Sequence, residues 1–217
     1  MGPAAFPKDA CSLRDGPPAG VRVGLSGGWV ASTLRLSDQT EATFEQASLL
    51  ASMSWRLGSS FTLQAGAGAL LGGYLQDLDG RHPFDPGLVL QVSGSWLLVP
   101  PREGGPFVAT SVGLSLLRAA TQAGLAGPAA DFTAADAFVS ASAGWPVAGW
   151  LSPYVAAKLF GGPVWWHRSS GAVTGTDANH YQVAVGAAAA LPGKFDLLVE
   201  WAPLGARAVT VALGREF

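Results

Sequence analysis

The sequence has few charged residues for its length. Of its 217 residues, 13% are Asp, Glu, Lys or Arg, compared with about 25% in a typical soluble domain. The formal net charge is −2, so the chain lacks the basic excess that binds nucleic acid. With a mean hydropathy of +0.30, such a chain is either unusually buried or surrounded by lipid.

Cysteine and long apolar runs are also scarce. Cys11 is the only cysteine, which excludes an internal disulfide bond. It lies in a Pro-rich stretch, residues 1–19, that has no apolar core of a signal peptide, so the signal of an exported protein would already have been removed. The longest charge-free runs, 57–76 and 137–157, are interrupted by Ser, Gly and Pro, whereas a spanning helix needs about 20 predominantly apolar residues. The sequence therefore argues against helical spans and predicts a flexible periplasmic tail over 1–19.

What the sequence does contain is alternation of apolar and small or polar residues. A period of two predicts β-strands, and glycine, with 29 residues, is frequent between and within the segments. Ten segments show this period: 20–34, 45–57, 61–73, 88–98, 107–118, 136–146, 153–166, 179–191, 195–202 and 206–217.

The connections between these segments alternate in length. Most of the odd-numbered connections are long and polar, and most of the even-numbered ones are short, as in transmembrane β-barrels. The sequence thus predicts an all-β fold, a single antiparallel up-and-down transmembrane β-barrel over residues 20–217. Ten strands is the favoured number and eight the alternative. The expected long loops are 36–44, 74–87, 119–134 and 167–178.

The two faces of the expected strands differ in chemistry. One face carries large apolar residues such as Val23, Leu25 and Trp29 and no charge, which predicts contact with lipid. The opposite face carries Gly, Ala, Ser and Gln, which suits a confined lumen. The larger polar residues predicted to face the lumen are Arg22, Arg56, Gln64, Gln91, Lys158, Gln182, Asp196 and Glu200.

Aromatic residues of the apolar face gather near the ends of the expected strands. Amphipathic rings prefer the two membrane interfaces, so this arrangement predicts two girdles. The girdle residues are Trp29, Trp55, Phe61, Trp96, Trp145, Trp165, Tyr181, Phe195, Trp201 and Phe217.

The chain ends in "VTVALGREF", an alternating segment with a terminal aromatic residue. In this it resembles bacterial outer-membrane β-barrel proteins, the small porin-like and OmpA-like barrels. The resemblance implies a Gram-negative outer-membrane location, contact with outer-membrane lipid and lipopolysaccharide, and recognition of the last strand by the barrel-assembly machinery. It maps that signal onto Val209, Val211, Leu213 and Phe217, and the sequence departs from the pattern at Arg215.

Two polar segments contain candidate site residues. His167 and Ser169 resemble the His-x-Ser of outer-membrane lipid A deacylases, in which His activates a Ser nucleophile. The orienting acid is missing from the matching place, and Asp177 is the nearby substitute. The segment 77–85 resembles part of a calcium loop but lacks the remaining ligands, so exposed turn residues explain it better. We expect no metal and no other cofactor.

The predicted lumen indicates the general class of function. Ten strands is intermediate between side-chain-filled barrels and open pores, and inward Phe138, Tyr154 and Phe160 would narrow the lumen. Lys158 and Glu200 are expected to meet over Gly186 as an ion pair. The sequence predicts a structural or narrow-channel barrel, with a small solute in its lumen at most and loops exposed for interaction. The alternatives are a lipid A deacylase-like hydrolase and an adhesin or subunit of an envelope complex that uses 74–87 and 119–134.

Overall fold

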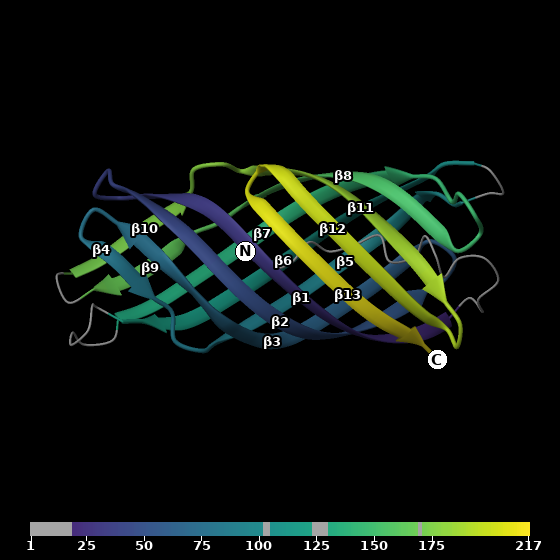
Figure 1. The fold of residues 1–217 in the computed structure, drawn as a ribbon, viewed down its shortest axis with the longest axis horizontal. Coiled ribbons are helices and arrows are strands. Elements are labelled where there is room, and N and C mark those ends of the chain that lie inside the picture. The colour runs from purple at the N-terminus through teal and green to yellow at the C-terminus, as the bar shows by residue number, and fades with distance from the viewer. Residues whose placement is uncertain (1–18, 102–104, 123–129, 169–170) are drawn as a thin grey trace.

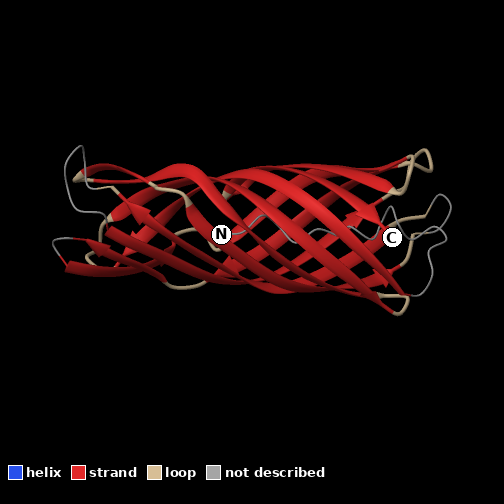
Figure 2. Ribbon diagram, turned by 90° about the horizontal axis from the view of Figure 1, so that it is seen from below, coloured by secondary structure: helices blue, strands red, loops and turns tan. Residues whose placement is uncertain are grey.

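The computed structural model describes residues 19–101, 105–122, 130–168 and 171–217. This part of the chain is all-β, and its strands run obliquely around one elongated barrel with loops at both ends (Figures 1 and 2). None of its segments is a helix with the length and hydropathy to cross a membrane. The flexible tail predicted over 1–19 and the loop predicted over 119–134 fall partly outside the described residues, at 1–18 and 123–129. Ala19 is the first residue of the first strand.

The described residues form thirteen strands. Their bounds are β1 Ala19–Leu36, β2 Glu41–Leu57, β3 Phe61–Asp77, β4 Gly80–Pro83, β5 Gly87–Val99, β6 Phe107–Thr121, β7 Ala130–Gly144, β8 Leu151–Gly161, β9 Val164–Arg168, β10 Gly171–Asp177, β11 Tyr181–Leu191, β12 Phe195–Gly205 and β13 Arg207–Glu216.

Ten of these strands close a ring, which confirms the expected ten-strand barrel over the eight-strand alternative. The ring order is β1, β2, β3, β5, β6, β7, β8, β11, β12 and β13, with every pair antiparallel. The last strand returns to the first over ten residue pairs, from Arg22–Glu216 to Ala31–Arg207. This seam satisfies the backbone groups of both edge strands, as a barrel in hydrocarbon requires.

The remaining strands extend the wall at the long-loop end. There β9 continues the register of β8 on β7, β10 pairs with both β9 and β1, and β4 pairs with β3. Phe84, just after β4, bridges to Thr121 of β6. The wall at this level is therefore made by β1, β2, β3, β4, β6, β7, β9 and β10, while β11, β12 and β13 end below it.

This extension corrects the expected loops. The segments 36–44, 74–87, 119–134 and 167–178 were interpreted as loops because they are polar, yet each contributes strand residues to the upper wall. Their outward residues, such as Glu41, Thr43 and Asp131, are polar, and the residues between them, such as Leu36 and Phe44, are buried. The alternation persists with its polarity reversed, so apolar side chains face the inside of the barrel at this end.

Over the rest of the barrel the predicted orientation holds. Large apolar side chains on the outer face are exposed, for example Leu25 at 51% and Leu159 at 61%. Most Ser and Gln residues of the opposite phase are buried inside the ring. In water such an exposed apolar band would be an aggregation liability, and in a bilayer it is the surface that contacts acyl chains.

Candidate functional site

The candidate site is the lumen, which differs between its turn end, its middle and its long-loop end. Of the residues predicted to line it, Arg22, Gln91, Lys158, Gln182 and Glu200 are buried on the inner face. Arg56, Gln64 and Asp196 are half-buried on the same face. The structure thus distributes these residues along the inner wall rather than gathering them at one point.

At the turn end an ion pair crosses the last strand. The Arg22 guanidinium on β1 donates to both carboxylate oxygens of Asp196 on β12, with Nε to Oδ2 at 2.6 Å. Between them lies Gly214 of β13, which pairs with Gly24 on one side and Asp196 on the other. A Cβ at Gly214 would collide with the guanidinium, so this glycine opens the path for the pair.

A second ion pair crosses the first strand in the same way. Arg56 Nη2 on β2 lies 3.5 Å from Glu216 Oε1 on β13, and Gly20 of β1 lies between them, paired with Arg56. A Cβ at Gly20 would be 3.0 Å from the Glu216 carboxylate. Together the two pairs join β2, β1, β13 and β12, and we call them the seam ion pairs.

In the middle of the lumen, the predicted contact of Lys158 with Glu200 over Gly186 is wrong, because Lys158 does not lie at the same level of the barrel as Gly186. Gly186 pairs with Glu200 on one side and with Tyr154 on the other, and the Tyr154 hydroxyl donates to Glu200 Oε2 at 2.9 Å. Lys158 lies opposite Gln182, and its ammonium is 4.5 Å from the centre of the Phe138 ring. Sequence spacing misplaced Lys158 because the strand registers are staggered around the barrel.

At the long-loop end three phenylalanine rings close the lumen. Phe44 of β2 stacks on Phe132 of β7 with ring centres 5.7 Å apart. Phe84 contacts both rings edge-on, at 5.6 and 5.1 Å. In the upper wall β2 and β7 are separated by three strands in either direction, so this contact spans the barrel. We call these three residues the phenylalanine plug.

The plug belongs to a larger apolar layer. Leu34, Leu75, Leu117 and Trp166 are buried in the same cluster, and the Trp166 indole donates to the Thr121 hydroxyl at 2.9 Å. Aromatic contacts at these separations stabilise by about 0.5–1.5 kcal/mol beyond the area they bury. This layer was not predicted from the sequence, although the apolar alternation inside the polar segments indicates it.

Charged side chains link the loops around the plug. Arg168 of β9 contacts Asp38 Oδ2 at 2.8 Å, Asp77 Oδ2 at 3.2 Å and Asp79 Oδ2 at 3.6 Å, and we call these four residues the Arg168 cluster. The His82 imidazole lies 3.2 Å from the Asp77 carboxylate. Hydrogen bonds from the Thr40 side chain and main chain, followed by Arg168, hold the pKa of Asp38 below its ordinary value of 3.8.

The Arg168 cluster accounts for the acidic segment that resembles a calcium loop. Asp77 and Asp79 face a guanidinium, and Asp85 accepts a hydrogen bond from the Gln122 side chain at 2.6 Å. In the described ranges no group of three or more His, Cys, Asp or Glu residues is arranged to hold a metal ion.

The two candidate catalytic residues are not brought together in the described structure. His167 is exposed on the outer face of β9, opposite Asp131 of β7. Ser169 lies outside the described residues. Asp177, the substitute acid, is buried inside the barrel and accepts a hydrogen bond from Ser32 at 3.0 Å, so it is on the other side of the wall from His167.

The predicted girdle residues lie on the outer face. Trp55 and Phe61 are half-exposed, and the other eight are exposed: Trp29, Trp96, Trp145, Trp165, Tyr181, Phe195, Trp201 and Phe217. Val209, Val211 and Leu213, which the sequence resemblance assigns to an assembly signal, are also exposed on the outer face of β13. Arg215, where the sequence departs from the family pattern, places its guanidinium 5.2 Å from the Phe195 ring centre and 5.1 Å from that of Phe217.

Comparison with known proteins identifies the fold. No protein-family profile matches the chain, and no curated protein matches it in sequence. Among solved structures, the outer membrane protease OmpT from Escherichia coli superposes with a TM-score of 0.52 at 12% identity, over 92% of this chain and 96% of that one. The outer membrane protein OprG from Pseudomonas aeruginosa gives 0.51 at 9% identity, over 93% and 98%.

The chain therefore has the fold of the bacterial outer-membrane β-barrel proteins. The closed ring and the exposed apolar band place the protein in the bacterial outer membrane. At sequence identities this low, the similarity establishes only the fold. The function therefore has to be argued from the residues of the lumen.

Proposed function

We propose that the protein is a narrow channel for small solutes that is closed at rest by the phenylalanine plug. The observation that carries the proposal is the contact of Phe44, Phe84 and Phe132 across the barrel. An apolar constriction of this kind blocks ions and water until it opens. With the long loops on the cell surface, the usual orientation of such barrels, the plug closes the outer mouth.

The residues that line the lumen below the plug favour a conducting path over a purely structural barrel. The inner face of the wall there carries buried polar residues, Ser48, Ser52, Gln91 and Ser93. The inner face of β7 and β8 carries the buried rings of Phe138 and Phe160. The path that fits a channel is therefore the polar side along β2 and β5, beneath the plug, and it conducts only when the plug is displaced.

The Arg168 cluster supports a closed resting state. It joins β9 to the β1–β2 turn through Asp38 and to the β3–β4 turn through Asp77 and Asp79. The Arg168 guanidinium also lies 4.6 Å from the Trp166 ring, which packs in the same layer as the plug. These contacts hold three parts of the upper wall around the three rings.

Recordings in planar bilayers test the proposal. We expect the wild-type chain to be silent at moderate voltage and the Phe132→Ser variant to show conductance steps, because the plug loses the ring that spans the barrel. Phe195→Ser, which removes an exposed outer ring, is the matched control and should stay silent. Steady conductance by the wild-type chain would contradict the closed state. A silent Phe132→Ser barrel that migrates as folded on unheated gels would contradict the plug.

The other sequence-based hypotheses remain predictions. A hydrolase would need Ser169 and a base that reaches it, and lipid A left intact by the folded protein would dismiss that hypothesis. Recognition of the C-terminal strand by the barrel-assembly machinery rests on Val209, Val211, Leu213 and Phe217. An adhesin or complex subunit would use the surface around 74–87 and 119–134, and pull-down with loop-deleted variants tests it.

A further inference from the structure

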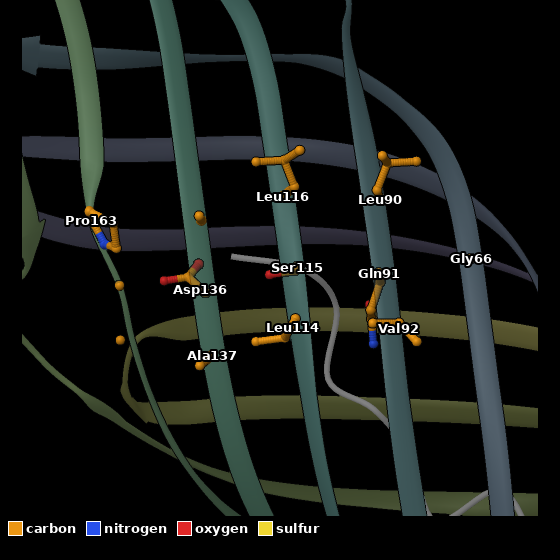
Figure 3. Close-up of a pocket in the computed structure, with 13 residues that line it drawn as sticks. Gly66, Leu90, Gln91, Val92, Leu114, Ser115, Leu116, Asp136, Ala137 and Pro163 are labelled. Atoms are coloured by element: carbon orange, nitrogen blue, oxygen red, sulfur yellow. The ribbon is translucent and has the colours of Figure 1, made fainter.

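The first polar level beneath the phenylalanine plug crosses neighbouring strands of the barrel. Strand pairing sets Gly66 of β3, Gln91 of β5, Ser115 of β6 and Asp136 of β7 in one row, and Figure 3 shows the four residues at one level. Gln91 and Asp136 are buried and Ser115 is half-buried, whereas the neighbours of Gln91 along β5 are exposed on the outer face. The row therefore faces the lumen, and we call Gln91, Ser115 and Asp136 the acceptor row.

The apolar layer around the plug lies directly on this row. The next row toward the long-loop end contains Leu50, Val89 and Leu117, which are buried in the same cluster as the plug. A Cβ at Gly66 would be 3.0 Å from the Leu50 side chain, so the two rows are in contact. A solute that enters past a displaced plug would therefore meet the acceptor row first.

Gln91 supplies an acceptor that the described residues leave without a donor. Its side-chain oxygen, Oε1, is buried and has no hydrogen-bond partner among them. An unsatisfied buried acceptor is unfavourable, and such a group often has a role in binding. Asp136 lies two strands away, about 10 Å along the row, and Ser115 lies between the two. A ligand that donates hydrogen bonds and carries a positive charge matches this arrangement.

The buried charges of the lumen also favour a cation. The two residues of each seam ion pair neutralise each other. The other buried charged residues of the described ranges are three carboxylates and one ammonium, those of Asp136, Asp177, Glu200 and Lys158. A wall with an excess of one sign of charge attracts ions of the opposite sign and repels those of the same sign, and it does so more strongly where water is scarce. The lumen is therefore suited to positively charged solutes.

We propose that the acceptor row binds the primary ammonium group of a small organic cation, which makes amines the solute class of the proposed channel. Asp136 supplies the opposite charge, and Gln91 Oε1 and the Ser115 hydroxyl accept the remaining N–H bonds. A primary ammonium has three N–H donors and no acceptor, so it fits a row of three acceptors. The inference rests on the proposed function, in which the lumen is a solute path, but binding to the row is measured without conduction.

Isothermal titration calorimetry of the full chain in non-ionic detergent at pH 7, with butylammonium chloride, tests the site. Asp136→Asn should weaken binding about tenfold, because a charged hydrogen bond is lost. Asp131→Asn, exposed on the outer face of the same strand, is the matched control and should bind as the wild type does. Equal affinities of Asp136→Asn and the wild type would overturn the site.

The hydrogen bond to Gln91 is tested with Gln91→Met, which also carries the test if Asp136→Asn does not fold. Gln91→Met should weaken butylammonium binding about fivefold, whereas Gln76→Met, exposed on β3, should not. Tetramethylammonium has the same charge and no N–H donor, so the wild type and Gln91→Met should bind it equally. Binding of sodium butanoate as tight as that of butylammonium would overturn the assignment to cations.

The same titrations on Phe132→Ser separate this inference from the proposed function. Binding of butylammonium by Phe132→Ser alone would support both the acceptor row and the closed plug. A barrel that binds butylammonium but stays electrically silent in both forms would contradict the channel and leave the site standing. Absence of binding by both forms would overturn the site.

Discussion

Single glycines inside this barrel decide where long side chains can pass. Gly214 is the clearest case, because the Arg22 guanidinium occupies the space that a Cβ would take on its way to Asp196. Arg22 could avoid that Cβ only by leaving Asp196. A small residue on the last strand is thus a requirement of the ion pair beside it.

We therefore expect Gly214→Ala to destabilise the barrel by about 1–3 kcal/mol, the usual cost of overpacking. Gly27→Ala is the matched control, because the nearest atom to a Cβ there is 3.8 Å away. The measurement is the temperature at which the folded gel band is lost in detergent. Equal temperatures for the two variants would show that the space over Gly214 is not needed.

At the scale of the elements, the seam ion pairs join strands that are not adjacent in the ring. One pair joins β1 to β12 across β13, and the other joins β2 to β13 across β1. The side chains of Arg22 and Asp196 are 9% and 16% exposed, whereas those of Arg35 and Glu41, an ion pair on the outer face, are 66% and 60% exposed. Hydrogen bonds to charged groups contribute more when they are shielded from water.

A double-mutant cycle on Arg22→Gln and Asp196→Asn should give a coupling free energy of about 1.5–3 kcal/mol. The same cycle on Arg35→Gln and Glu41→Gln should give about 0–1 kcal/mol. Chemical unfolding in detergent or lipid vesicles measures both. A coupling at Arg22 no larger than that at Arg35 would mean that the first pair does not strengthen the seam.

The upper wall has its own charged contacts, and Asp38 makes them depend on pH. Because hydrogen bonds hold the folded-state pKa of Asp38 below 3.8, its stabilising effect is present above that pH and is lost as the pH falls through the lowered value. Asp38→Asn should therefore unfold at a lower temperature than the wild type at pH 7. The difference should vanish in strong acid, and a difference that is independent of pH would refute the assignment to the carboxylate.

At the scale of the whole molecule, the sequence predicts the membrane part of the barrel well. Alternation over segments such as 45–57 and 206–217 reports which side of the wall each residue faces, because one side contacts lipid along its whole length. The same rule puts Arg22 and Glu200 on the inner face, where both are buried in the structure. The alternation did not predict that Tyr154 is the partner of Glu200, because contacts between strands two apart depend on how the strand registers are staggered around the barrel.

The alternation that predicts the membrane part of the barrel does not reveal the phenylalanine plug. Phe44, Phe84 and Phe132 all lie in segments that were interpreted as loops. Beyond the girdle the outer face of the wall is polar and the inner face apolar, so the local composition is that of a loop. The pairing of β2, β6 and β7 up to their long-loop ends, together with the pairing of β4, β9 and β10, shows that these segments are wall.

Trp165 and Trp166 report most directly on this account, because they are neighbours that face opposite sides of the wall. Trp165 is 37% exposed on the outer face, and Trp166 is 1% exposed in the plug layer. The measurement is tryptophan quenching by brominated lipids in vesicles containing the wild type, Trp165→Phe or Trp166→Phe. The account predicts that Trp165→Phe lowers the lipid-quenched fraction and Trp166→Phe does not. Loss of that fraction in Trp166→Phe, with Trp165→Phe unchanged, would contradict it.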